Sequence, residues 1–522
     1  MIRRYSASAD NTIVNSFKPD LITRATGANC GLADVLEVYS IYGRQYTGSQ
    51  ELSRVLIKFP VNQISADRTS GLLPASGSVN YYLRLYNAPT SKTVPKDFIL
   101  VANPMGSPWQ EGVGLDLEGY KDATKGNAGS NWMSASLSAS WNSVSGGADW
   151  VSSSADYRYE QTFPVGIEDL EVNITPLVER WIKGSSGGGI ANYGLGIKLT
   201  SSMESFGTSS TTNIGTTQNI QSVQNNKGGA TKSYYTKRFF ARGTQYFFKR
   251  PMIEARWSDV TRDERGEFFF SSSRAPAADN LNTVYFYNYI RGRLANLPGV
   301  GTGLIRVSLY SGSTYNTHPS GSKLMLYDAK PNMTGGWVST GIYSCSIGID
   351  SSSVTTLYDV WHSQSLGASS TVTEYYTGSI LPQLQGGGNT NVLPRYIIDI
   401  TNLNRLYRSD ELVRLNVFIR NKNWNPNIYN RAGASPDSLV IPSASYMIYR
   451  VMDGYPAVPY GTGSDFQTGL SYDVSGSYFD LNMKLLEPGY AYGIKLSFYN
   501  EELKSWREQS PTFKFRVENY EY

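Results

Sequence analysis

Short alternating runs separated by turn residues constrain the fold of this chain more than any other feature. Residues 35–39 (VLEVY), 54–59 (RVLIKF) and 81–86 (YYLRLY) place apolar side chains at about every second position, the period of a strand with one buried face. Clusters of Ser, Gly, Pro and Asn interrupt the runs at short intervals, and these residues favour turns. The pattern predicts an all-β protein.

The length of the chain and the order of its segments predict three β-sandwich domains in series. The chain has 522 residues, and a domain usually needs about 100–200. We expect the domains to span residues 1–260, 268–392 and 396–522. Residues 201–231 are nearly all Ser, Thr, Asn, Gln and Gly, a composition that cannot form a core. We interpret them as a solvated insertion between strands of the first domain, with an extended interaction arm as the alternative.

One helix is expected, at residues 175–184. Thr175 suits the N-cap, Pro176 the first helical position and Gly184 the exit. Four residues at helical spacing form its apolar face: Leu177, Val178, Trp181 and Ile182.

Charge and cysteine content argue against several classes of protein. Charged residues make up 17% of the chain and the net charge is +4, too weak to indicate nucleic-acid or anionic-membrane binding. No run approaches the ~20 apolar residues of a membrane span, and the N-terminus does not resemble a signal peptide. Cys30 and Cys345 lie far apart, so we expect no disulfide framework and folding in a reducing cytoplasm.

The sequence contains little material for catalysis. His318 and His362 are its two histidines, and we expect both to be structural or solvated. No nucleophile elbow, P-loop or zinc motif appears. The close acidic residues are interpreted as solvated faces or a charged turn, with calcium binding as the alternative for the last four: Asp116 and Glu118; Glu168, Asp169 and Glu171; Asp259, Asp263, Glu264 and Glu267. We expect no enzyme, cofactor or metal.

Tryptophans near predicted turns raise the alternative of sugar binding. Trp109, Trp132 and Trp141, with Trp150, could form an aromatic platform for a glycan. The same residues could instead anchor long loops onto the sandwich. We expect the anchoring role and keep the platform as the alternative.

The segment LEPGYAYGIKL at residues 486–496 resembles the tyrosine corner of immunoglobulin-like and fibronectin type III sandwiches. The resemblance implies that the hydroxyl of Tyr492 bonds to the upstream backbone, while Leu486 and Pro488 shape the corner. It implies an Ig-like third domain, and we expect the second domain to be Ig-like as well.

The first domain resembles the DNRLRE-type β-sandwich modules, which look like carbohydrate-binding jelly rolls. The similarity lies in an ordered series of motifs: NTIV at 11–14, VLEV at 35–38, RVLIKF at 54–59, YLRLY at 82–86, WQEG at 109–112, Trp132, Trp141 and the helix at 175–184. The resemblance implies a jelly-roll-like fold for residues 1–260.

The whole chain, with RGTQYF at 242–247 and the segment 486–492, resembles large virion structural proteins of tailed phages, particularly marine cyanophages. This implies a non-enzymatic virion component in the neck, tail or capsid periphery, made in the host cytoplasm. Its partners would be copies of itself and other virion proteins. The aromatic and basic stretch 232–256 fits such an assembly surface better than nucleic acid. The alternatives are a glycan-binding adhesin acting through the first domain and, less favoured, a tail enzyme that degrades cell walls.

Overall fold

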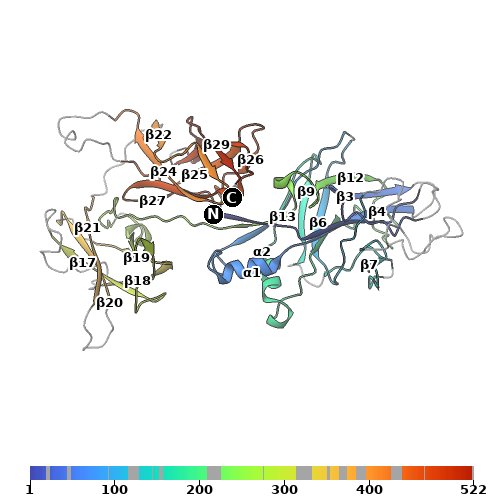
Figure 1. Ribbon diagram of the computed structural model, residues 1–522, viewed down its shortest axis with the longest axis horizontal. Coiled ribbons are helices and arrows are strands. Elements are labelled where there is room, and N and C mark those ends of the chain that lie inside the picture. The colour runs from blue at the N-terminus through green and yellow to red at the C-terminus, as the bar shows by residue number, and fades with distance from the viewer. Residues whose placement is uncertain are drawn as a thin grey trace. The chain divides into compact units, whose positions relative to one another are not determined.

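The chain, described here by a computed structural model, consists mainly of antiparallel β-sheets (Figure 1). The all-β prediction is confirmed. The structure describes all residues except 19–23, 44–48, 92, 116–128, 144, 152–156, 208–224, 274, 313–331, 350–352, 364–372, 384–394, 425–437, 464, 502 and 520–522. The chain divides into unit 1, Met1–Ser258 with Gly463–Gln467, and unit 2, Asp259–Thr462 with Thr468–Tyr522.

Unit 1 contains two main antiparallel sheets. The four-stranded sheet has the order β1 (Ile2–Ser6), β13 (Met252–Arg256), β5 (Asn80–Leu85), β10 (Leu170–Asn173). The seven-stranded sheet has the order β12 (Tyr234–Phe240), β3 (Val35–Gly43), β4 (Ser49–Lys58), β11 (Leu195–Leu199), β6 (Phe98–Pro104), β9 (Tyr159–Phe163), and β2 (Ala9–Val14) pairs with β4. A small hairpin joins β7 (Ser134–Ser136) and β8 (Ala139–Ser140).

The core of unit 1 takes alternate side chains from both sheets, as a sandwich requires. Tyr81, Leu83 and Leu85 of β5 are fully buried, and so are Val55 and Ile57 of β4. All five belong to one apolar cluster. The strand period seen in the sequence therefore identifies which face of each strand is buried.

Two helices pack side by side in unit 1 (Figure 1): α1 (Val61–Thr69) and α2 (Thr175–Lys183). Helix α2 was expected, but its N-cap is Ile174 and not Thr175. The hydroxyl of Thr175 instead accepts a hydrogen bond from the Tyr81 amide at 2.8 Å, which ties the helix to β5. Short 3-10 helices are η4 (Ser185–Gly187), η6 (Phe247–Lys249), η7 (Ala277–Asn280) and η10 (Met483–Leu485).

The first part of unit 2 is one continuously paired sheet. Its order is β14 (Asn282–Tyr287), β19 (Ile342–Ile347), β18 (Met333–Ser339), β17 (Ile305–Ser311), β20 (Leu357–Ser363), β21 (Thr373–Ile380), beside a hairpin of β15 (Tyr289–Ile290) and β16 (Arg293–Leu294). The Phe286 ring centroid lies 5.6 Å from that of Trp361 and 5.2 Å from that of Tyr376. The two ends of the sheet therefore face each other across a shared core.

The second part of unit 2 is a two-sheet sandwich. One sheet has the order β22 (Tyr396–Ile400), β24 (Leu412–Asn421), β28 (Gly476–Asn482), β27 (Ser471–Asp473). The other has the order β23 (Leu406–Arg408), β31 (Phe513–Glu518), β29 (Ala491–Asn500), β25 (Ala444–Arg450), β26 (Pro456–Val458), and β30 (Ser505–Glu508) pairs with β29. Tyr446 and Phe479 stack between the sheets with ring centroids 4.1 Å apart. The division of the chain into three domains stays a prediction.

The geometry of a tyrosine corner is present before β29. The hydroxyl of Tyr492 donates to the Glu487 carbonyl at 2.8 Å. Tyr492 and Leu486 are buried, while Pro488 is half-buried. The hydrogen bond fixes the path of the chain as it enters the strand.

Both cysteines are free and buried, Cys30 in unit 1 and Cys345 in unit 2. Among the described residues, no helix is long and apolar enough to cross a membrane.

Candidate functional site

The seven-stranded sheet of unit 1 has an outer face that carries polar side chains. Val55 and Ile57 of β4 point into the core, so Arg54, which directly precedes Val55, points the other way. Lys198 of β11 and Asn103 of β6 take the same outward direction, since their strand neighbours are core residues. Because β11 pairs with both β4 and β6, these three polar residues lie on adjacent strands.

Tryptophans from the segment 105–150 cover part of this face. Trp132 is fully buried and Trp141 is 5% exposed, within an apolar cluster that includes Leu52. Trp109 packs against the same cluster, and its indole N–H donates to the Tyr193 carbonyl at 2.8 Å. Since Trp132 and Trp141 present no open ring face, a glycan platform made from them is ruled out. These residues anchor the overlying loop.

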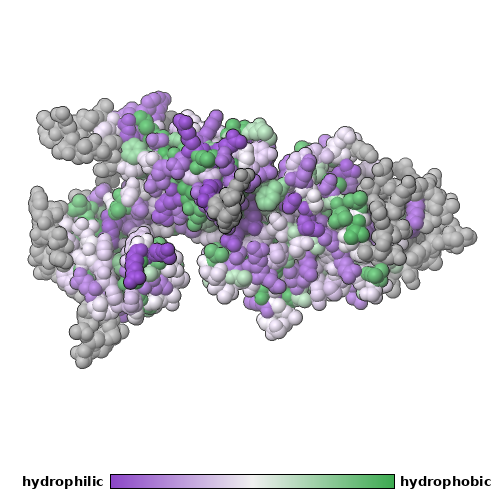
Figure 2. Space-filling model, in the orientation of Figure 1, coloured by the Kyte–Doolittle hydropathy of each residue, from purple (hydrophilic) through white to green (hydrophobic). Residues whose placement is uncertain are grey.

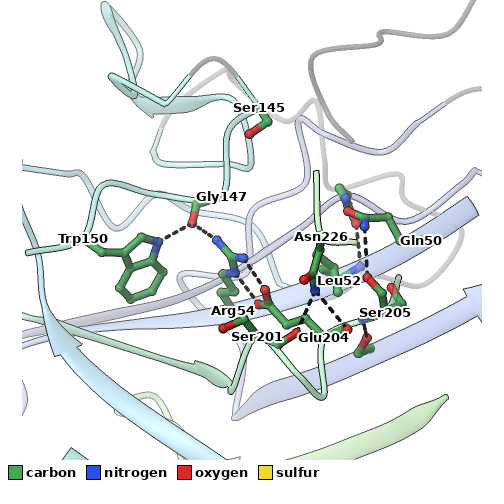
Figure 3. Close-up of polar contacts among 12 residues, drawn as sticks. Gln50, Leu52, Arg54, Ser145, Gly147, Trp150, Ser201, Glu204, Ser205 and Asn226 are labelled. Atoms are coloured by element: carbon green, nitrogen blue, oxygen red, sulfur yellow. Dashed lines mark hydrogen bonds and ion pairs between the residues drawn. The ribbon is translucent and has the colours of Figure 1, made fainter. Parts of the chain in front are cut away.

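A buried ion pair lies at the centre of the outer face (Figure 3). The Arg54 guanidinium donates to both carboxylate oxygens of Glu204, at 2.9 and 2.8 Å, and to the Gly147 carbonyl at 2.7 Å. Its carbon lies 5.2 Å from the Trp132 ring centroid and 5.6 Å from that of Trp150. A bidentate pair of this kind has a defined geometry, and Arg54 needs it because the residue is only 1% exposed.

The polar insertion supplies Glu204 from its described base. The Glu204 carbonyl accepts from the Ala230 amide at 2.9 Å and from the Asn226 side chain at 3.2 Å. The next residue, Ser205, donates its amide to the Ser40 hydroxyl at 2.7 Å and accepts at its carbonyl from the Gln50 side chain (Figure 3). The interpretation of 201–231 as a solvated loop is therefore wrong for its base, which is bonded to the sheet.

Trp150 forms a half-buried wall next to this ion pair. Its indole N–H donates to the Gly147 carbonyl at 3.1 Å. Its ring occupies the space where a Cβ at Gly196 would stand, because such a carbon would lie 2.3 Å from the ring. The Lys198 ammonium lies 4.7 Å from the ring centroid, a cation–π distance.

Asp149 fixes the loop beside Trp150. Its carboxylate accepts from the Ser107 hydroxyl at 2.8 Å, from the Ser143 amide at 3.0 Å, and from the amide and side chain of Asn142 at 3.0 and 2.9 Å. Because its carboxylate accepts four hydrogen bonds from this loop, Asp149 stabilises the loop at the rim of the outer face.

These elements enclose a cavity of about 740 Å³ in unit 1. This volume lies within the range of small-molecule sites. Besides Arg54, Trp150 and Lys198, the lining includes amides and hydroxyls that can bond to a polar ligand: Asn103, Asn142, Ser143, Ser201, Asn225 and Asn226. Such a lining suits a ligand rich in hydroxyl groups better than an apolar one.

The cavity has an excess of positive charge. Arg54, Arg158 and Lys198 line it with Asp149 and Glu204. Burial lowers the pKa of Lys198 to about 8; the nearby Arg54 adds to the effect and Glu204 opposes it. Among the described residues, Lys198 has no hydrogen-bond or ion-pair partner, so the Trp150 ring is its contact.

The two carboxylates of the cavity are already used by protein groups. Glu204 binds Arg54 through both oxygens, and Asp149 accepts four hydrogen bonds. A general acid needs a proton that it can give to the substrate, and neither group is placed for that.

Other candidates from the sequence occupy structural positions. His362 is buried, and its Nε2 lies 2.9 Å from the Ser308 hydroxyl. Asp263 accepts from the Arg265 amide at 3.1 Å, and Glu171 pairs with Arg256 at 2.8 Å. No group of acidic, His or Cys side chains that could hold a metal occurs in the part of the chain that is described. Asp116, Glu118 and His318 lie outside that part.

Three residues of the cavity were missed as a group from the sequence: Arg54, Lys198 and Glu204. A signal existed for Arg54 and Lys198, because each is a cation at a strand position that alternates with core residues. Glu204 had a weaker one, as a single acidic residue in a long uncharged stretch. Nothing in the sequence indicates that the three lie together.

Comparisons with known proteins add no assignment. No protein-family model matches the chain, and no curated protein matches it. Among solved structures, the chain is similar to a DUF4785 family protein from Legionella pneumophila, at 7% identity and a TM-score of 0.13, over 98% of this chain and 92% of that chain. At this TM-score the similarity carries no conclusion about fold or function.

Proposed function

We propose that the protein is a non-catalytic glycan-binding adhesin and that unit 1 holds its binding site. The observation that carries the proposal is the polar cavity on the outer face of the seven-stranded sheet, with Trp150 as its wall. Amide and hydroxyl groups match the hydroxyls of a sugar, and an indole supports its apolar faces.

The rigidity of the site supports a binding role. Arg54, Glu204 and Trp150 are held by the hydrogen bonds at Gly147 and by the bidentate ion pair (Figure 3). A site that is ordered before the ligand arrives loses less entropy on binding. The occupied carboxylates further favour recognition without turnover.

Filling the cavity tests the proposal. Ser201 lines the cavity and is exposed, so Ser201→Trp places an indole where the ligand would lie. On a glycan array and by calorimetry, we expect this variant to lose binding by at least about tenfold. The matched control is Ser78→Trp, at an exposed position of unit 1 away from the cavity. Equal binding by both variants would contradict the proposal.

A virion structural role is the second candidate, and exposed apolar side chains in unit 2 favour it. Apolar and polar side chains are mixed on the face in Figure 2, and scattered apolar residues are normal. In unit 2, however, several gather on the β15–β16 hairpin, on β18 and before β17: Tyr289, Ile290, Leu294, Leu304, Trp337 and Val338. A Cβ at Gly336 would lie 4.0 Å from Leu304, and Trp337 bonds to Asn296 at 3.1 Å, so these elements adjoin.

Such a cluster suits contacts with other virion proteins or with copies of the chain. The structural role predicts that purified particles contain the protein in a symmetric copy number. It also predicts that Leu304→Asp, with Leu304 74% exposed, prevents incorporation without unfolding the protein. Its absence from particles would exclude this role.

A further inference from the structure

The Lys198 ammonium is the one cation lining the cavity that has no ion-pair partner within the described residues. Lys198 lies on the outer face of β11, and its ammonium contacts the Trp150 ring at 4.7 Å from the centroid. Among the described residues, Glu204 pairs with Arg54 and Glu160 with Arg158, while Asp149 accepts hydrogen bonds from its own loop. Lys198 is half-buried, and a partly desolvated cation without a partner is unfavourable, so the site is suited to an anion supplied by the ligand.

The surrounding charges also favour an anion. Arg54 of β4 and Arg158, which precedes β9, both lower the pKa of Lys198, while Glu204 raises it. These groups and the Trp150 ring face Lys198 from the neighbouring elements. Because Glu204 neutralises Arg54 and Glu160 neutralises Arg158, the Lys198 ammonium is the cation left for an anionic ligand, in a partly enclosed cavity where electrostatic attraction is stronger than in water.

We propose that the cavity selects acidic saccharides, with Lys198 as the residue that pairs with the anionic group of the sugar. This inference rests on the proposed glycan-binding function and names its ligand class. The anionic group can be a carboxylate, as in a uronic acid, or a sulfate ester. In either case the ammonium and the anion form a charge-assisted hydrogen bond, while the lining amides and hydroxyls bond to the ring hydroxyls.

Protonation of Lys198 then controls the selectivity. Its pKa of about 8 means that the ammonium is charged at pH 6.5 and largely neutral at pH 9.5. Uronates and sulfates keep their charge throughout this interval. The preference for acidic over neutral sugars should therefore decline as the pH rises through about 8, while binding of neutral sugars changes little.

The experiment compares oligogalacturonates with their methyl esters, and sulfated oligosaccharides with their unsulfated parents, by calorimetry at pH 6.5 and 9.5. The wild-type protein should bind at least one acidic series about tenfold or more tightly than its neutral counterpart at pH 6.5. Lys198→Met should abolish that preference, so that the acidic and neutral members of a series bind with equal affinity. Lys198→Arg should keep the preference at pH 9.5. Lys183→Met, at an exposed position at the end of α2, is the matched control.

The outcomes separate this inference from the proposed function. Equal binding of acidic and neutral sugars, lost in Ser201→Trp, would overturn the role of Lys198 and leave glycan binding in place. An acidic preference that survives in Lys198→Met would overturn it as well. Failure of every sugar to bind would overturn both. The preferred acidic series identifies the anionic group as carboxylate or sulfate.

Discussion

Replacing Glu254 by Gln tests whether a buried carboxylate surrounded by arginines stabilises unit 1. Glu254 lies on β13 and is fully buried. It pairs with Arg4 of β1 at 2.9 Å, with Arg84 of β5 at 3.4 Å and with Arg256 at 2.6 Å. Because these strands are neighbours in the four-stranded sheet, the carboxylate links three of its strands.

The magnitude follows from the pKa of Glu254. Although burial opposes ionisation, the three arginines lower this pKa from 4.5 to about 2. At about 1.4 kcal/mol per unit, the ionised form stabilises the folded state by about 3 kcal/mol. Removing one partner of a buried ion pair typically costs about 3–5 kcal/mol. Since Arg84 and Arg256 retain Glu171 as a partner, we expect Glu254→Gln to destabilise unit 1 by about 3 kcal/mol at pH 7.

The effect should depend on pH in a defined direction. A carboxylate with a lowered folded-state pKa contributes stability above pH 4.5, and this contribution is lost as the pH falls toward 2. The difference between wild type and Glu254→Gln should therefore shrink across that window. Hydrogen exchange of the β5 and β13 amides measures it without assuming two-state unfolding of the whole chain.

A matched control separates burial from charge. Glu160 pairs with Arg158 through side chains that are 40% and 50% exposed, so Glu160→Gln should change stability by less than about 1 kcal/mol. A Glu254→Gln effect as small as that of the control, or one independent of pH, would refute the reasoning.

Three further predictions follow from single contacts. Tyr492→Phe should destabilise the C-terminal sandwich by roughly 1–3 kcal/mol, because the half-buried Glu487 carbonyl loses its 2.8 Å hydrogen bond; thermal unfolding measures this. Gly196→Ala should displace the Trp150 ring, which lies 2.3 Å from the added carbon, and shift the tryptophan fluorescence. Burial raises the pKa of Asp10 to about 7, so its contribution to stability is complete below about pH 4 and lost as the pH rises through 7. Asp10→Asn should remove this loss and stabilise unit 1 by roughly 2–4 kcal/mol at pH 8 in denaturant titrations.

Each of these predictions has a control or a contradicting result. Tyr490→Phe, beside the corner, should be nearly neutral, and an equal loss of stability would contradict the role of the Tyr492 hydroxyl. Gly228→Ala adds a carbon with no atom within 4 Å and should leave the fluorescence unchanged. For Asp10→Asn, a loss of stability at pH 8 would contradict the assignment.

The sequence could predict the strands of unit 1 because burial and the strand period coincide there. In β5, the alternation of Tyr81, Leu83 and Leu85 with polar residues matches the buried face residue by residue. Helix α1 gave no such signal. It buries Val61, Ile64 and Asp67, and the last of these is a charged residue that binds the Tyr5 hydroxyl at 2.6 Å. Tertiary hydrogen bonding, which composition does not reveal, explains its place in the fold.

The tryptophans show how far residue type can predict a site. Their clustering near turns predicts that they hold long loops, and Trp132 and Trp141 are buried, but Trp132, Trp141 and Trp150 have the same chemistry in the sequence. What distinguishes Trp150 is the missing side chain at Gly196 in a strand remote from it in sequence. That space lets the ring pack closely against β11 at the cavity wall. Exposure of an aromatic residue is therefore set by the partner strand, and a local pattern cannot reveal it.

The polar insertion gives the strongest case of a composition that misleads. A stretch of Ser, Thr, Asn, Gln and Gly is expected to be solvated because it lacks apolar surface to bury. The base of the insertion is not solvated in this way, because Glu204 neutralises the charge of Arg54. Arg54 lies on β4 and is 1% exposed. The ion pair makes the base of the insertion part of the sandwich and places Ser201 and Asn226 in the cavity wall.

Glu204→Gln should therefore both destabilise unit 1 by about 3 kcal/mol and weaken glycan binding, whereas Ser201→Trp should affect binding alone. Hydrogen exchange of β4 together with calorimetry would distinguish the two, and loss of binding in Glu204→Gln without loss of β4 protection would contradict the structural role of the pair.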